Sequence, residues 1–268
     1  MRAAKGKYAP DQSLHGPPMI VDRVPSGIPG LDNVLQGGIP ANSTIALRAE
    51  PSNFTESILQ QFVAEGLKHG SPAIYCCLSR PVASLVNSMR QQGFDILEPV
   101  ANDQLVIIDC YSMQRRTSGI GVEQNIQKKI ISVPEVDDER ILQDGLASAV
   151  ERMANLKGVR AVCESVPGTL TSRPPIEVMR WGRRAFADLR AFEAVAVHTF
   201  PMGVREELFS MMAHDFDGIM ELGAERSGDR MRHFMSIPKM RMTTVTEKVL
   251  DLDMEDSRVV VKTTQRIV

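Results

Sequence analysis

Apolar and polar residues alternate along the chain with two different periods. Short apolar runs predict buried strands, and longer stretches with apolar residues three and four positions apart predict amphipathic helices. The predicted strands cover residues 43–47, 73–78, 104–109, 159–164, 193–199, 217–222, 231–237 and 258–262, and the predicted helices cover residues 57–68, 82–92, 139–156 and 175–192. Because the first five strands alternate with helices, the pattern predicts an α/β fold with a mostly parallel central sheet flanked by helices. The last three strands predict an antiparallel C-terminal extension.

The same pattern sets the domain organisation. Residues 1–21 are polar and contain Gly16-Pro17-Pro18, so we expect a flexible N-terminal tail followed by a single domain over residues 22–268. Residues 114–138 are polar apart from an apolar patch at 126–133, which is typical of a surface insertion or a contact loop. No internal repeat is visible.

Composition narrows the function classes. The chain has 268 residues, of which 43% are hydrophobic and 24% charged, as in a soluble globular protein, and we expect it in the cytoplasm. A net charge of −2 provides no general basic field, so nucleic-acid binding is not expected. No apolar run is long enough for a membrane span. The four cysteines lack metal-ligand spacing and fit the role of small apolar residues, with Cys76 and Cys77 on opposite faces of their strand.

Short glycine motifs near the start of the domain stand in a fixed order. They are Ser26-Gly27-Ile28-Pro29-Gly30-Leu31-Asp32, then Gly37-Gly38-Ile39-Pro40, and then the strand at 43–47. This order resembles the start of the KaiC-like branch of the RecA superfamily of P-loop ATPases, and the likeness continues over roughly residues 22–261. The resemblance implies a RecA-like P-loop fold, and its family members generally bind ATP and assemble into rings.

In that family, the loop between this strand and the next helix reads G-x-x-x-x-G-K-[ST]. The candidate nucleotide-binding positions here are Ala49, Glu50, Pro51, Ser52, Asn53, Phe54, Thr55 and Glu56. Ala49 and Phe54 stand for the glycines. Thr55 stands for the lysine and Glu56 for the hydroxyl residue, so all four defining positions have changed.

These changes alter what the loop can bind. In a P-loop, glycines let backbone N–H groups wrap phosphates, the lysine pairs with the terminal phosphates, and the hydroxyl ligates Mg²⁺. Phe54 cannot take a left-handed glycine conformation cheaply because of its Cβ. Glu50 and Glu56 add negative charge, and no cation in the loop offsets it. We expect Glu56 in the first helical turn, with Asn53 or Thr55 as the N-cap.

The residues expected to support hydrolysis are also changed. After its second strand the family has two acidic residues before a proline, whereas this chain has Ser79 and Arg80, which cannot act as carboxylate bases. Glu164 takes the place of the Walker B aspartate that holds Mg²⁺ and is the Walker B-like candidate. Asp109 ends an earlier strand and is a lesser candidate. We expect no catalytic residues and no metal site, apart from this ambiguous glutamate.

Three other features have a functional and a structural interpretation. Lys239 and Arg241 match the family's K-x-R segment, which reaches the nucleotide of a neighbouring subunit. They are therefore possible inter-subunit residues. The structural alternative is a solvated basic pair after a strand. His198 ends a strand where the family senses nucleotide state, yet most such histidines are structural. The arginines of the helix at 175–192 are more simply solvated than bound to DNA.

Two functions follow from these residues. The first is a catalytically degenerate KaiC/RecA-like protein, a pseudo-ATPase acting as a regulatory or assembly subunit, without a cofactor. Its partners would be copies of itself or a RecA/KaiC-like paralogue. The alternative is an atypical ATPase that binds ATP and Mg²⁺ in a nucleotide-gated oligomer, or an accessory protein of DNA repair and recombination. Because the loop has lost its phosphate-binding residues, the sequence favours the first.

Overall fold

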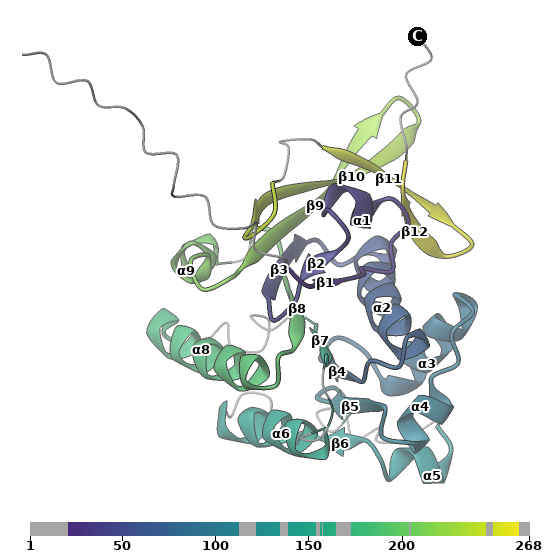
Figure 1. Ribbon diagram of the computed structural model, residues 1–268, viewed down its shortest axis with the longest axis vertical. Coiled ribbons are helices and arrows are strands. Elements are labelled where there is room, and N and C mark those ends of the chain that lie inside the picture. The colour runs from purple at the N-terminus through teal and green to yellow at the C-terminus, as the bar shows by residue number, and fades with distance from the viewer. Residues whose placement is uncertain are drawn as a thin grey trace, which may run out of the picture.

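The computed structural model describes residues 21–112, 122–134, 139–153, 156, 158–164, 173–203, 205–244 and 249–262. Several expectations therefore lie outside the described residues: the tail up to position 20, positions 114–121 and 135–138 of the polar segment, and positions 154 and 155 of the expected helix. Within the described residues, strands and helices alternate along the chain (Figure 1).

One large sheet organises the molecule. Ten strands of the described residues lie side by side in the order β12-β11-β10-β9-β3-β8-β7-β4-β5-β6. Their bounds are β3 (Thr44–Ala49), β4 (Ala73–Cys77), β5 (Leu105–Asp109), β6 (Ile131–Ser132), β7 (Arg160–Cys163), β8 (Val195–Phe200), β9 (Gly218–Ser227), β10 (Arg230–Met240), β11 (Leu250–Glu255) and β12 (Arg258–Val261). The strands from β9 to β6 pair in parallel, and β9 to β12 pair antiparallel. Both the mostly parallel sheet and its antiparallel C-terminal extension are thus confirmed.

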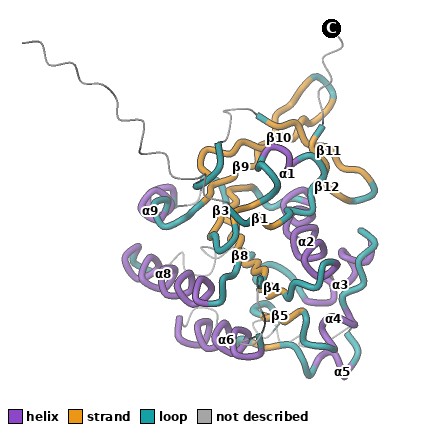
Figure 2. The backbone as a smooth tube through the Cα atoms, viewed as in Figure 1, coloured by secondary structure: helices purple, strands orange, loops and turns teal. Residues whose placement is uncertain are grey.

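Helices cover both faces of the parallel part, as Figures 1 and 2 show. One side carries α2 (Asn53–Lys68), α3 (Val82–Gln91), α4 (Leu97–Ala101) and α5 (Gln124–Gln127), and the other carries α6 (Glu139–Arg152) and α8 (Pro175–Ala191). The short helix α9 (Glu206–Met212) contacts α8, while α1 (Leu31–Val34) and the small sheet of β1 (Arg23–Val24) and β2 (Ile39–Pro40) precede β3. The result is a helix–sheet–helix sandwich.

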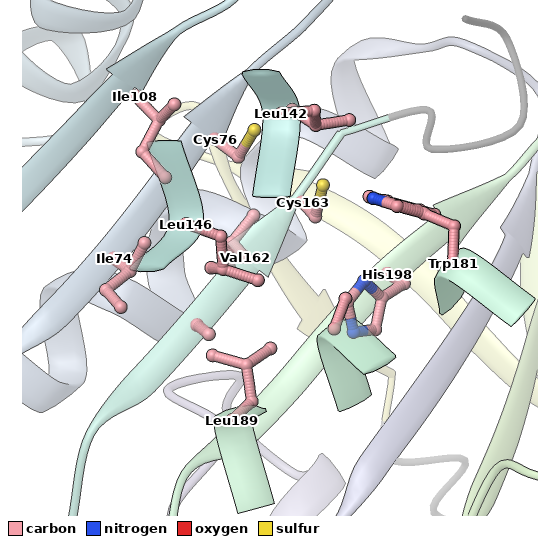
Figure 3. A pocket seen from close by; sticks show the side chains of 12 residues that line it. Ile74, Cys76, Ile108, Leu142, Leu146, Val162, Cys163, Trp181, Leu189 and His198 are labelled. Carbon is pink, nitrogen blue, oxygen red and sulfur yellow. The ribbon is translucent and has the colours of Figure 1, made fainter. Parts of the chain in front are cut away.

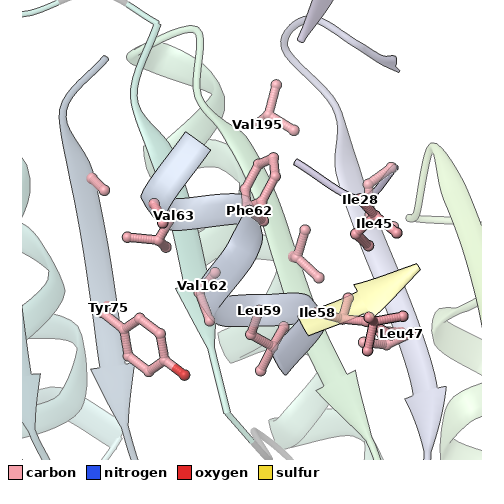
Figure 4. Packing of buried hydrophobic residues seen from close by; sticks show 14 of the residues in the cluster. Ile28, Ile45, Leu47, Ile58, Leu59, Phe62, Val63, Tyr75, Val162 and Val195 are labelled. Atoms are coloured by element: carbon pink, nitrogen blue, oxygen red, sulfur yellow. The ribbon is translucent and has the colours of Figure 1, made fainter. Parts of the chain in front are cut away.

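The two faces of the sheet bury separate apolar cores, because side chains alternate along each strand. On the α2 side, Phe62 and its helical neighbours face Ile45, Tyr75 and Val162 of the strands (Figure 4). On the α8 side, Trp181 and Phe186 pack with Ile74 and Cys76. Cys76 and Cys77 therefore lie on opposite faces, as expected.

Three expectations need correction. The patch at 126–133 is not wholly a surface insertion, because Ile126 and Val133 are buried and β6 extends the sheet beside β5. The sequence pattern also missed β11, whose polar residues alternate with Leu250 and Leu252. Finally, α9 was not expected, because its run of seven residues is too short for a helical period to be recognised.

Candidate functional site

The candidate site lies at the carboxyl ends of the parallel strands β3, β7 and β4, with β8 between β3 and β7. The loop after β3 leads into α2, the connection after β4 leads into α3, and Glu164 directly follows β7. In open α/β sheets, ligands bind at this edge, where the loops diverge from the strand ends. Five of the loop residues singled out by the sequence meet Ser79, Arg80 and Glu164 here, namely Ala49, Pro51, Ser52, Thr55 and Glu56.

The start of α2 differs from the expected one. The helix begins at Asn53, four residues earlier than the pattern predicted, so Phe54, Thr55 and Glu56 belong to its first turn. Ser52 is the N-cap, instead of Asn53 or Thr55, and its side chain accepts a bond from the backbone N–H of Thr55 at 3.2 Å. The hydroxyl of Thr55 donates to the carbonyl of Glu50 at 2.8 Å. The first bond satisfies one N–H group of the helix end within the chain itself, and the second ties the helix to the loop before it.

The loop backbone avoids the conformations for which a P-loop needs glycine. None of residues 49–56, all of them described, has a positive φ angle. The ring of Phe54 stacks on His233 of β10 with the ring centroids 3.9 Å apart. A side chain therefore anchors this position to the antiparallel extension, where a glycine would leave the backbone open to a ligand.

A buried guanidinium joins the two candidate carboxylates. Arg80 forms ion pairs with Glu164, at 2.8 Å, and with Glu56. The carboxylate of Glu164 also accepts bonds from the hydroxyl of Ser79 at 2.6 Å and from the phenol of Tyr75 at 2.8 Å. Glu164 is 4% exposed, so its own contacts are shielded from water, whereas 44% of the Glu56 side chain remains exposed.

The charges in this network reinforce each other. Burial alone lowers the pKa of the Arg80 guanidinium, but Tyr75 and the carboxylates of Glu164 and Glu56 outweigh burial and raise it. Burial and the neighbouring Glu164 raise the pKa of the Tyr75 phenol well above its ordinary value. Arg80 is therefore a permanent cation, and Tyr75 remains a hydrogen-bond donor near neutral pH.

The network supplies from outside the loop the cation that the loop itself lacks. The cation comes from outside the loop, from the β4–α3 connection, where the sequence had marked Arg80 only as a lost acidic residue. Tyr75 was missed altogether, because its strand position predicts a core residue. The only usable signal was the joint appearance of Glu56, Arg80 and Glu164 at positions that the fold places together.

The space left at this edge is small. A cavity of about 70 Å³ is lined by Ala49, Pro51, Ser52, Thr55, Glu56, Leu59, Ser79, Glu164, Thr199 and Pro201. Between these side chains the cavity has room for a few water molecules.

The other singled-out carboxylate has a structural role. Asp109 is buried, and its Oδ1 accepts bonds from the backbone N–H groups of Tyr111 and Ser112, at 3.0 and 2.9 Å. Such bonds stabilise the turn that follows β5. The carboxylate is thus used in shaping the backbone, in agreement with its lesser standing as a candidate.

His198 faces away from the network, into the apolar core beside α8. With Trp181, Cys76 and Cys163 it lines a cavity of about 30 Å³ (Figure 3). Neither ring nitrogen has a hydrogen-bond partner in the structure, and burial lowers the pKa of His198 to about 4. The imidazole is therefore neutral near pH 7, and it is not part of the candidate site.

Lys239 and Arg241 lie at the opposite edge of the sheet, because Lys239 pairs with Ile219 at the start of β9. Lys239 donates to the carbonyl of Ala213 at 2.9 Å, and Arg241 forms an ion pair with Asp217 at 2.7 Å. Burial, followed by the nearby Arg241, lowers the pKa of Lys239. The fold thus separates these two residues from the loop of their own chain.

Two searches of the described residues were negative. They contain no group of three or more His, Cys, Asp or Glu side chains arranged to hold a metal ion. Nor do they contain a helix that is both long and apolar enough to cross a membrane.

Comparisons with known proteins agree with the fold. The chain is 25% identical to a UPF0273 protein of Pyrococcus furiosus, covering 90% of this chain and 94% of the relative, and 28% identical to one of Methanocaldococcus jannaschii, covering 89% and 96%. It superposes on the crystal structure of a KaiC-like protein of Pyrococcus horikoshii with a TM-score of 0.66, at 19% identity, covering 91% of this chain and 100% of that one. The family model described as "ATPase: KaiC" matches residues 24–266, so this chain belongs to the KaiC family of ATPase domains.

Proposed function

We propose that this protein is a catalytically degenerate member of its family, a pseudo-ATPase that acts as a regulatory or assembly subunit through protein–protein contacts. The observation that supports this most is the Arg80 guanidinium held between Glu56 and Glu164. Glu56 stands where the family has the Mg²⁺-binding hydroxyl, and Glu164 where it has the Walker B aspartate. A built-in cation therefore occupies the place between the two positions that would hold Mg²⁺.

This arrangement disfavours Mg-ATP in two ways. Binding a divalent cation between the same carboxylates would bring it against a guanidinium that cannot lose its proton, which is repulsive in a shielded site. A triphosphate arriving without the metal would meet the carboxylate of Glu56, while the cation it needs is already paired.

A role in assembly follows from the parts that remain intact. The family scaffold is complete across the sheet, and Lys239 and Arg241 lie at the edge opposite the loop. Both residues are held by bonds within their own chain, so completing a site on another subunit would require them to exchange these bonds, and 51% of the Arg241 side chain is exposed for this. Under this proposal the partners are further copies of the chain or a KaiC-like paralogue with a working P-loop.

The test is a calorimetric titration of the wild-type chain with Mg-ATP, with sedimentation on the same sample. We expect no binding heat up to about 1 mM ATP. A Kd of about 1 mM corresponds to a binding free energy of about 4 kcal/mol, so any binding would be weaker than this. We also expect an oligomeric state that does not change with nucleotide. Micromolar binding or measurable hydrolysis by the wild type would overturn the proposal in favour of nucleotide-gated assembly.

Two variants show whether the named residues are the cause. Replacing Phe54-Thr55-Glu56 by Gly-Lys-Thr and adding Arg80→Ser restores the loop chemistry and removes the built-in cation, and we expect ATP binding to appear. Arg90→Ser is the matched control, because Arg90 lies on α3 with 46% of its side chain exposed. If the loop variant binds no better than this control, backbone geometry beyond these side chains has been lost.

A further inference from the structure

Three of the four cysteines gather on the α8 side of the sheet. In the strand pairing, His198 of β8 stands opposite Cys163 of β7, and Cys163 stands opposite Cys76 of β4. Cys110 directly follows β5, with its Sγ 3.6 Å from the Sγ of Cys76. Cys76 is therefore the central member of a row of thiols.

Pairing and exposure distinguish the two neighbours of Cys76. Directly opposed residues of adjacent parallel strands have Cα atoms about 4.8 Å apart, within the range of roughly 4.4–6.8 Å found across disulfides. Cys76 and Cys163 satisfy this condition, and both line the same cavity (Figure 3). Cys163 is also partly exposed, whereas Cys76 and Cys110 are buried. A small oxidant reaches Cys163 first.

We propose that Cys163 and Cys76 form a modification site, at which a hydroperoxide oxidises Cys163 and a disulfide to Cys76 follows. In the first step the sulfur of Cys163 attacks the peroxide oxygen, giving a sulfenic acid and one molecule of water or alcohol. In the second step the sulfur of Cys76 attacks the sulfenic sulfur, and the departing hydroxide takes the proton of the Cys76 thiol to form water. The two thiols lose two electrons in total, which reduce the peroxide.

The position of this bond gives it a consequence for the candidate site. Glu164 follows Cys163 directly, and its backbone N–H donates to the carbonyl of Cys76 at 3.2 Å. A bond between Cys163 and Cys76 fixes β7 to β4 immediately beneath the ion pairs of Arg80. The assignment does not depend on the proposed function, because it rests on the thiols alone.

The reaction is expected to be slow. Contact with the thiols of Cys110 and Cys163, together with burial, raises the pKa of Cys76 well above its ordinary value, so little thiolate is present at neutral pH. The thiolate is the reactive form. We therefore expect conversion over minutes to hours in excess peroxide.

The test treats the purified, reduced chain with hydrogen peroxide, blocks the remaining thiols with a maleimide, and maps tryptic peptides without reduction. Because the peptide from His69 to Arg90 carries both Cys76 and Cys77, the mapping is done on Cys77→Ala as well as on the wild type. We expect this peptide to be linked to the one that contains Cys163. The link should reverse with dithiothreitol, persist in Cys110→Ala and disappear in Cys163→Ser.

Other products would overturn the assignment. A disulfide between Cys76 and Cys110, sulfinic or sulfonic acid on Cys163 alone, or three unmodified thiols after prolonged peroxide treatment each contradict it. The wild type and Cys77→Ala decide the question even if a variant at Cys163 fails to fold.

Discussion

The two ends of β7 bury charged side chains in opposite ways. At the amino end, Arg160 is 2% exposed and donates to the carbonyls of Pro25 and Phe62, at 2.7 and 2.8 Å. At the carboxyl end, Glu164 is held by Arg80 and two hydroxyl groups. Burial lowers the pKa of Arg160 to about 10, partly offset by Glu65 and Asp32, whereas the carboxylates around Arg80 raise its pKa.

The difference separates architecture from site. Arg160 donates to neutral carbonyls and so ties the segment before α1 to α2. Its charge neutralises no carboxylate through these bonds. Under the proposed function, Arg80 neutralises two carboxylates that stand at family positions for a metal, and its charge takes the place of that metal. The carboxyl end is also the edge where ligands bind in this class of sheet. A buried cation paired with carboxylates at that edge is therefore more informative about function than one bonded to carbonyls.

The largest expected effect is at the amino end. Arg160→Met keeps the apolar stem but removes the guanidinium, so the carbonyls of Pro25 and Phe62 lose this donor and the contact with the Phe62 ring is lost. We expect a loss of about 3–4 kcal/mol in the free energy of unfolding, measured by urea denaturation. Arg183→Met on α8, where 55% of the side chain is exposed, is the control. Equal losses in both variants would remove the structural role of Arg160.

At the carboxyl end, stability should depend on whether the charge of Glu164 is paired, more than on the presence of Arg80 itself. Arg80→Met leaves Glu164 buried without its cation, and we expect a loss of about 2–3 kcal/mol at pH 7. The double variant Arg80→Met with Glu164→Gln should lose less than the single variant, because no uncompensated charge remains.

Acidity provides a second measure of this pairing. In Arg80→Met the deficit should shrink between pH 7 and pH 5, since an unpaired buried carboxyl group becomes protonated more easily. If the single and double variants have the same unfolding free energy at both pH values, the network is not held together by charge.

The smallest effect concerns His198, which is buried like Arg160 and Glu164 but is uncharged near pH 7. Its folded pKa of about 4 is below the ordinary value of 6.5, so the unfolded state binds more protons between these limits. The contribution to stability is fully present above pH 6.5 and is lost as the pH falls towards 4. The loss in the free energy of unfolding reaches about 2 kcal/mol by pH 5. His198→Leu should flatten this part of the stability curve, measured by urea denaturation at several pH values. His69→Leu, with 57% of the side chain exposed, should leave it unchanged.

Much of the fold was predictable because it depends on local patterns. The alternation of strand and helix periods indicated a parallel sheet with an antiparallel extension. The glycine motifs around Gly30 and Gly37 indicated the RecA-like fold by resemblance. The elements that escaped include α9, then β11, whose apolar residues are few, and β6, which has only two residues and pairs with β5. A short edge strand such as β6 is defined by its partner more than by its own sequence.

The sequence by itself determined that the loop at residues 49–56 lacks the glycines, lysine and hydroxyl of a P-loop, because residue identity decides which groups can meet a phosphate. Only the tertiary structure decided what replaced them. Glu56, Arg80 and Glu164 come from three separate segments and meet because parallel strands deliver their carboxyl ends to one edge. A cation distant in the sequence thus neutralises carboxylates that looked uncompensated, since Coulomb interactions depend on distance in space and on shielding from water.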